Sequence, residues 1–192
     1  MPLAPWRSPL ARALHRNRRE AHSRYLQLAT VQPNGRPANR TIVFRDYLDD
    51  RNTLAFITDA RSAKVNQILN NPWGEACWYF TESREQFRLA GRLQLIDAET
   101  ADATLIQARK KVWGSLSERA RQQFTWPEPG APKASPQNFD SQPPPADEPP
   151  EEYYLLTLEP LDVTHLELKG NPQNRTHYTL IDGVWEISSL NP

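Results

Sequence analysis

Residues 25–44 read YLQLATVQPNGRPANRTIVF. Polar and apolar side chains alternate through residues 25–31 and again through residues 37–44, which is typical of half-buried strands. The two runs are joined by QPNGR (residues 32–36), and an Asn-Gly pair favours a tight turn because both residues tolerate positive φ. This segment therefore predicts an antiparallel hairpin within a β-rich fold.

The rest of the chain adds strands more often than helices. The run QFRLAGRLQL (residues 86–95) alternates polar and apolar side chains, so it predicts a long strand with one polar face. Further strands are predicted at residues 53–58, 75–80, 153–158 and 163–168, and at two runs around Asp182-Gly183 that end at residue 187. Helices are predicted from Ser8-Pro9 to before Tyr25, at residues 62–70, and at about residues 98–117 after a capping Asp97. Many short antiparallel strands favour a closed or partly closed barrel, because closure removes exposed sheet edges.

A proline-rich segment interrupts this pattern at about residues 127–152. It holds half of the chain's 18 prolines, together with Gly, Ser, Gln and acidic residues. Such a composition predicts a loop or a disordered segment. We expect the 192 residues to form a single domain that carries this loop.

Composition gives no support to nucleic acid or a membrane as a partner. Lys and Arg total 23 and so do Asp and Glu, so no net positive charge favours nucleic acid or an anionic membrane. The arginines at positions 12, 16, 18 and 19 form a basic patch without aromatic neighbours, which leaves nucleic-acid binding as an alternative that salt-dependent DNA binding would revive. The sequence has neither a secretory signal nor a membrane-length apolar run. Its single cysteine, Cys77, lies in an apolar run and is expected to be a buried thiol, so we predict a cytoplasmic protein that acts on a small molecule.

Two segments carry charges that suit a phosphate group. FITDARSAK (residues 56–64) predicts a strand end, a turn and a helix that starts at Ser62, with Arg61 and Lys64 beside it. A helix N-terminus with free N–H groups, a hydroxyl and two cations is a favourable phosphate site, although an ordinary capped helix would have the same sequence. RTIVFR (residues 40–45) places Arg40 and Arg45 at the ends of a strand, where both could also be solvated edge charges.

RTIVFRD, FITDARSAK and EQFRLAGRL, in this order and at these spacings, resemble the FMN-binding core of the pyridoxamine 5′-phosphate oxidase family. The resemblance covers residues 25–96 and implies an FMN-binding split β-barrel, mainly β with peripheral helices, that forms a homodimer with FMN at the subunit interface. It implies that residues 40–43 and Arg45 line the flavin, that Ile57, Thr58 and Gln86 also contact it, and that Ser62 and Lys64 hold the phosphate. The implied cofactor-binding residues are Arg40, Thr41, Ile42, Val43, Arg45, Ile57, Thr58, Arg61, Ser62, Lys64 and Gln86.

The chain also departs from the family pattern. The family's phosphate loop reads Ser-Arg-Lys, whereas this chain has Ala63 at the middle position, so one cation is missing unless Arg61 replaces it. Near the C-terminus Leu168 stands where the family has a tryptophan, and Arg175 is the best remaining candidate for a substrate ligand beside Arg45. These changes indicate an altered substrate pocket and leave the catalytic residues unassigned.

The resemblance predicts an oxidoreductase in which substrate hydride passes to N5 of FMN and dioxygen reoxidises the flavin. Two alternatives stay open. One is an FMN-dependent reductase of another small molecule, which a donor-specific assay of flavin bleaching would distinguish from an oxidase. The other is a flavin-binding module without turnover. No metal site is predicted, because the four histidines, His15, His22, His165 and His177, are scattered along the sequence.

Overall fold

A computed structural model describes residues 3–48 and 52–192. The strands of the described chain are β1 (Tyr25–Val31), β2 (Pro37–Val43), β3 (Asp46–Tyr47), β4 (Leu54–Asp59), β5 (Trp73–Phe80), β6 (Glu85–Ile96), β7 (Tyr153–Glu167), β8 (Asn174–Ile181) and β9 (Val184–Leu190). The α-helices are α1 (Arg7–Arg16), α2 (Ala63–Asn70), α3 (Ala103–Gly114) and α4 (Glu118–Gln122), and short 3-10 turns cover Ala21–Arg24, Gln123–Thr125 and Pro136–Phe139. None of the described helices is long and apolar enough to cross a membrane.

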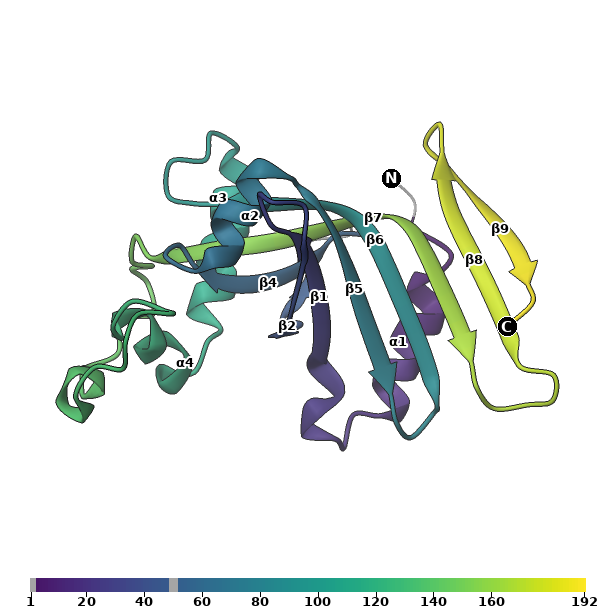
Figure 1. Ribbon diagram of the computed structural model, residues 1–192, viewed down its shortest axis with the longest axis horizontal. Helices are drawn as coiled ribbons and strands as arrows, with labels where there is room; N and C mark the ends of the chain where they lie inside the picture. The colour runs from purple at the N-terminus through teal and green to yellow at the C-terminus, as the bar shows by residue number, and fades with distance from the viewer. Residues whose placement is uncertain (1–2, 49–51) are drawn as a thin grey trace.

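The described strands form one antiparallel sheet that curls into a half-barrel (Figure 1). Its order is β2-β1-β5-β6-β7-β4-β3, and the β8–β9 hairpin adds to the far half of β7. The first part of β7 pairs with β4 and the last part pairs with β8. The two strands thus share the same edge of β7, each along a different part of its length. The prediction of a mainly β, partly closed barrel with peripheral helices is confirmed.

The predicted hairpins form where the turn residues allow them. β1 and β2 pair from Tyr25 with Val43 to Val31 with Pro37, and only Gly35 of the Asn-Gly pair takes positive φ, at 81°. In the β8–β9 turn, Asp182 and Gly183 both take positive φ, at 48° and 80°. Both turns therefore place a glycine in the left-handed region, which glycine enters without a steric penalty.

β7 is one strand where the sequence predicted two. Pro160 falls inside it and pairs with Gly91 of β6, where the register shifts by a bulge. A Cβ atom on Gly91 would lie 1.9 Å from the carbonyl oxygen of Glu159, so the backbones approach closely at this point. A bulge tolerates a residue without an N–H group, which explains why the proline does not end the strand.

The helix predicted at residues 98–117 is shorter than expected. Asp97 accepts hydrogen bonds from the N–H of Glu99 and the hydroxyl of Thr100, which closes a turn. Asp102 instead caps α3 by accepting from the N–H groups of Thr104 and Leu105. The prediction of Asp97 as the cap was therefore wrong, because a local turn uses its carboxylate. The last strand also runs to Leu190, three residues beyond the predicted end.

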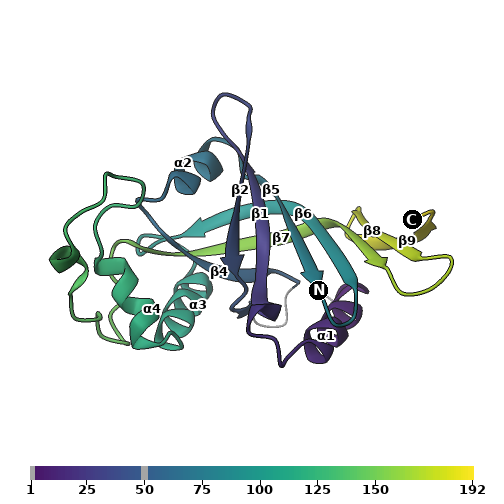
Figure 2. The same cartoon turned by 60° about the horizontal axis from the view of Figure 1, so that its bottom comes forward.

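Helices cover the two ends of the curled sheet (Figure 2). α1 buries Leu10 and Ala13 in the main core, and Trp6, just before it, is fully buried against the edge of Trp185. α3 packs Leu105, Ala108 and Val112 in a second cluster beneath β4, β6 and β7. The helices thus close the barrel ends while the outer edge of β2 stays uncovered by any described strand.

Candidate functional site

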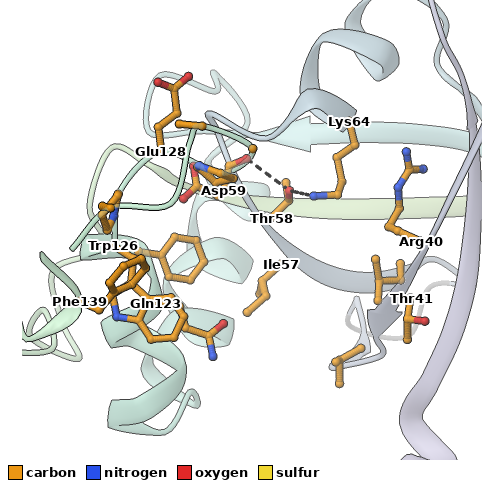
Figure 3. A pocket seen from close by; sticks show the side chains of 18 of the residues that line it. Arg40, Thr41, Ile57, Thr58, Asp59, Lys64, Gln123, Trp126, Glu128 and Phe139 are labelled. Carbon is orange, nitrogen blue, oxygen red and sulfur yellow. Dashed lines mark hydrogen bonds between the residues drawn. The ribbon is translucent and has the colours of Figure 1, made fainter. Parts of the chain in front are cut away.

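A cavity of about 620 Å³ opens between β2, the end of β4, the start of α2 and the segment 123–139 (Figure 3). This volume is within the range of small-molecule sites. Eight of the predicted site residues line it: Arg40, Thr41, Ile42, Val43, Arg45, Ile57, Thr58 and Lys64. Figure 3 shows Arg40 and Thr41 on one side, Trp126 and Phe139 on the other, and Ile57, Thr58 and Lys64 between them.

The turn between β4 and α2 fixes Lys64 at the inner end of the cavity. The Lys64 Nζ donates hydrogen bonds to Thr58 Oγ1 at 3.1 Å and to Ser62 Oγ at 2.6 Å. Ser62 occupies the N-cap position of α2, but its side chain accepts no hydrogen bond from the helix backbone. The expected serine cap is therefore absent because Lys64 engages the hydroxyl, and the first N–H groups of α2 have no side-chain cap.

Arg40 supplies a second cation at the same end. Its guanidinium donates to the carbonyl oxygens of Leu28 and Ala38, to Thr30 Oγ1 and to Gln67 Oε1, all of which are neutral acceptors. Burial lowers the pKa of Arg40, and burial followed by the charge of Arg40 lowers the pKa of Lys64. Among the described residues no carboxylate forms an ion pair with either cation. Although the charge of Asp59 partly offsets the lowering for Lys64, two desolvated cations without an ion pair favour an anionic ligand.

Arg61 points toward the segment after α4. Its guanidinium makes two hydrogen bonds to Asp59, at 2.9 and 2.6 Å, and donates to the carbonyl oxygens of Phe124 and Trp126. The hydrogen bond to Asp59 raises the pKa of Arg61. Arg61 does not belong to the cavity lining, so a direct role in phosphate binding stays a prediction.

Arg45 lies two residues after the end of β2 and lines both the large cavity and a smaller one of about 220 Å³. Its Nε is buried and has no hydrogen-bond partner among the described residues. Burial is the largest cause that lowers the pKa of Arg45. The smaller cavity is also lined by Lys111 and by Tyr47, whose buried hydroxyl has no partner in the same described part of the chain.

Gln86 and Arg175 lie away from this chain's cavity but close to each other. In the sheet, Gln86 is opposite Tyr79 on one side and Leu166 on the other, and Leu166 is opposite Arg175. Residues directly opposite one another in antiparallel strands share a face, so these four side chains form one row on the outer face of the sheet. The structure thus places eight predicted site residues in the cavity lining, Gln86 and Arg175 on the outer face, and Arg61 and Ser62 in the turn beside the cavity but outside its lining.

Sequence reasoning missed two features. Residues 127–152 were predicted to be a loop or disordered, whereas residues between 123 and 139 form one wall of the cavity. The aromatic residues Phe124, Trp126 and Phe139 in a polar, proline-rich stretch were the available signal. The second feature is the pair of His177 and Asp162, whose Nε2 and Oδ2 lie 2.6 Å apart on the face that carries Arg175.

His165, unlike the partly exposed His177, is buried, and neighbouring side chains satisfy its hydrogen bonding. His165 hydrogen-bonds Glu85 at 2.8 Å and stacks on Phe87, and Arg16 also contacts Glu85 at 3.0 Å. Glu167 lies near enough to complete a three-residue metal cluster, but Glu85 already has two partners. The absence of a metal site stays a prediction.

Comparison with known proteins places this geometry in context. Residues 3–97 match the family model described as the pyridoxamine 5′-phosphate oxidase, FMN-binding domain. A relative from Arabidopsis thaliana, called pyridoxine/pyridoxamine 5′-phosphate oxidase 2, is 42% identical over 195 residues, which cover 99% of this chain and 98% of the relative.

Two solved structures have the same fold. A pyridoxamine 5′-phosphate oxidase-related, FMN-binding protein from Nostoc punctiforme is 54% identical, with a TM-score of 0.97 and full coverage of both chains. PhzG from Burkholderia lata, solved with tetrahydrophenazine-1-carboxylic acid, is 20% identical with a TM-score of 0.80 and covers 100% of this chain and 94% of its own. The second likeness supports the fold alone.

The cavity residues fit FMN. Its phosphate carries about two negative charges near neutral pH, which matches the two uncompensated cations Arg40 and Lys64. Its ring edge needs donors and acceptors, and β2 is an edge strand whose outer backbone groups have no strand partner among the described residues. The buried, unpartnered Nε of Arg45 adds a donor at the far end.

Proposed function

This chain belongs to the FMN-binding pyridoxamine 5′-phosphate oxidase family, and we propose that it is an oxidase of phosphorylated pyridoxine or pyridoxamine. FMN is the cofactor, and the protein is a flavoprotein of the oxidoreductase type. The observation that carries the proposal is the cavity lined by Arg40 in the middle of β2, Lys64 of α2, and Arg45 just after β2.

We propose that the cavity holds FMN with its phosphate beside Arg40, Lys64 and the start of α2. Thr58 and Ser62 orient Lys64, and the edge of β2 from Thr41 to Val43 receives the ring, with Ile57 beside it. When bound, FMN supplies the redox chemistry: N5 takes a hydride from the substrate carbon, and dioxygen takes the electrons to give hydrogen peroxide. The residues of the chain position the two molecules and exclude water from the cavity.

Arg45 is proposed to hold the substrate anion. It borders both cavities, and its buried Nε has a donor to spare among the described contacts. Burial raises the pKa of Tyr47 to about 12, so its hydroxyl keeps its proton near neutral pH and can donate. Together with the cation of Lys111, these groups make the smaller cavity a suitable place for a substrate phosphate.

We further propose a homodimer in which the outer face of one subunit completes the cavity of the other. The row that contains Gln86 and Arg175 also exposes large side chains, with Tyr79 and Leu190 each 42% accessible. Such half-exposed apolar side chains mixed with charges are typical of subunit contacts. Sedimentation at assay concentration should give twice the chain mass, whereas a monomer that binds FMN would overturn this arrangement.

The function is tested by spectrum and turnover together. The purified protein should show the absorbance bands of oxidised flavin, and pyridoxine or pyridoxamine 5′-phosphate should yield hydrogen peroxide and pyridoxal 5′-phosphate in equal amounts. The unphosphorylated substrates should react with a much higher KM. If the flavin is reduced only by a nicotinamide or deazaflavin donor, the chain is a reductase. If neither substrate nor donor reduces it, the chain is a flavin-binding module.

Arg45→Met should raise the KM for pyridoxine 5′-phosphate about tenfold or more, because a charge-assisted hydrogen bond to the phosphate is lost. The KM for unphosphorylated pyridoxine should change little. Steady-state kinetics with both substrates measures this difference, and flavin content measured on the same samples checks cofactor binding. A loss of FMN without a substrate-selective change in KM would show that Arg45 serves the cofactor instead.

A further inference from the structure

The proline-rich wall of the cavity is fixed at its base. Arg61, held by Asp59, donates to the carbonyl oxygens of Phe124 and Trp126. Farther along, Gln122 donates to the carbonyl oxygen of Ser141 at 2.7 Å, and Arg121 donates to that of Pro144 at 3.0 Å.

A contact between two aromatic rings holds the wall together between the hydrogen bonds of Arg61 and those of Arg121 and Gln122. The rings of Trp126 and Phe139 meet edge to face at 5.7 Å, so residues 126–139 form a loop whose two ends are joined. The intervening prolines further restrict the backbone. The wall is thus held against the cavity, and it lies beyond residues 3–97, which carry the match to the family.

More cations than carboxylates line the cavity. Four cations line it, Arg40, Arg45, Lys64 and Lys133, against two carboxylates, Asp59 and Glu128. Asp59 is paired with Arg61 at 2.6 Å, and the charge of Glu128 also acts on Arg61 and raises its pKa. Lys133 has no ion pair or hydrogen bond with any described residue. The wall therefore brings a cation without an ion pair to a cavity in which Asp59 is paired with Arg61 and also acts on Lys64.

We propose that Lys133 is a further cofactor-binding residue and supplies the phosphate of FMN with the cation that Ala63 leaves missing. Arg61 is then a positioning residue: it holds the wall that carries Lys133 and does not bind phosphate itself. Figure 3 places Trp126 and Phe139 of the wall across the cavity from Arg40, with Lys64 between them, and Lys133 of the same wall also lines this cavity. This inference rests on the proposed position of FMN in the cavity.

The test compares FMN with riboflavin, which has the same ring and ribityl chain but no phosphate. Dissociation constants are measured by flavin fluorescence on apoprotein. Lys133→Ala should weaken FMN binding about tenfold and leave riboflavin binding unchanged, because the variant loses one charge-assisted contact to phosphate. Lys133→Glu should weaken FMN binding further, and Lys133→Arg should restore it. The matched control is Lys110→Ala, an exposed lysine on α3 that does not line the cavity.

Arg61→Gln tests the positioning role of Arg61, again through the ratio of FMN affinity to riboflavin affinity. It should weaken FMN binding, and adding Lys133→Ala to it should cause little further loss, because the cation is already displaced. An unchanged ratio of FMN to riboflavin affinity in Lys133→Ala would overturn the inference while leaving the FMN site intact. A wild-type protein that binds riboflavin as tightly as FMN would instead contradict the proposed phosphate site itself.

Discussion

An FMN affinity about a hundred times weaker than that of the wild-type chain is the expected result of Lys64→Met. Lys64 is the most enclosed of the cavity's cations, and Thr58 and Ser62 fix its ammonium group. The variant loses the charge that faces the phosphate but keeps a side chain of similar length. Titration of apoprotein with FMN and riboflavin measures the effect, and riboflavin affinity should be almost unchanged.

The lowered pKa of Lys64 also determines how FMN binding should depend on pH. The pKa of Lys64 is lowered in the free protein, and a bound phosphate would favour the charged form and raise that pKa again. FMN affinity should therefore fall as the pH rises above the lowered pKa of the free protein, and this fall should be smaller in Lys64→Met. Lys110→Met is the control for loss of a lysine elsewhere.

The stability of the apoprotein separates a binding effect from a folding effect. Lys64 is a desolvated cation without a carboxylate ion pair among the described residues, so its replacement by Met should not lower the free energy of unfolding of the apoprotein. If the variant unfolds more easily and loses both flavins equally, Lys64 is a structural residue and the phosphate lies elsewhere.

Activity should return when Lys64→Met and Arg175→Ala subunits are joined in one dimer. Arg175 lies on the outer face, outside its own chain's cavity lining, so we expect it to serve the cavity of the partner. A mixed dimer then has one cavity with both substitutions and one with neither. Purified through two different tags, it should show about half the wild-type turnover per dimer, since a two-fold dimer has two equivalent sites.

The parent homodimers are the controls, because each should be nearly inactive: one lacks bound FMN and the other binds substrate poorly. The FMN content of the mixed dimer is a second measurement, because FMN should be retained in the cavity that keeps Lys64. Turnover of the mixed dimer at the mean of the two parents would show that Arg175 acts within its own chain or outside the site.

Much of the β fold could be predicted from sequence, because the relevant signals are local. The alternation around the Asn34-Gly35 turn gave the first hairpin, and residues 86–95 gave β6 to within a residue at each end. Two of the three segments that carry the family resemblance, residues 40–46 and 56–64, then placed eight of the predicted residues around one cavity. These segments lie on β2, β4 and α2, whose positions are set by neighbouring strand pairing.

What escaped prediction depends on long-range contacts. The hydrogen bonds of Arg61 could not be predicted, because only the fold shows that Asp59 and the carbonyl oxygens of Phe124 and Trp126 surround its guanidinium. The wall at residues 126–139 is held by hydrogen bonds and ring contacts that no periodic pattern encodes. β7 was divided in two because a proline ordinarily ends a strand, and the bulge opposite Gly91 is a tertiary feature.

The most direct test of the account is a crystal structure of the chain with FMN bound. The account predicts the FMN phosphate within hydrogen-bonding distance of Lys64 and Arg40, at about 3 Å, with the ring edge along β2 and residues 126–139 covering the opposite side. FMN bound elsewhere, or in this cavity with its phosphate away from Lys64, would contradict it.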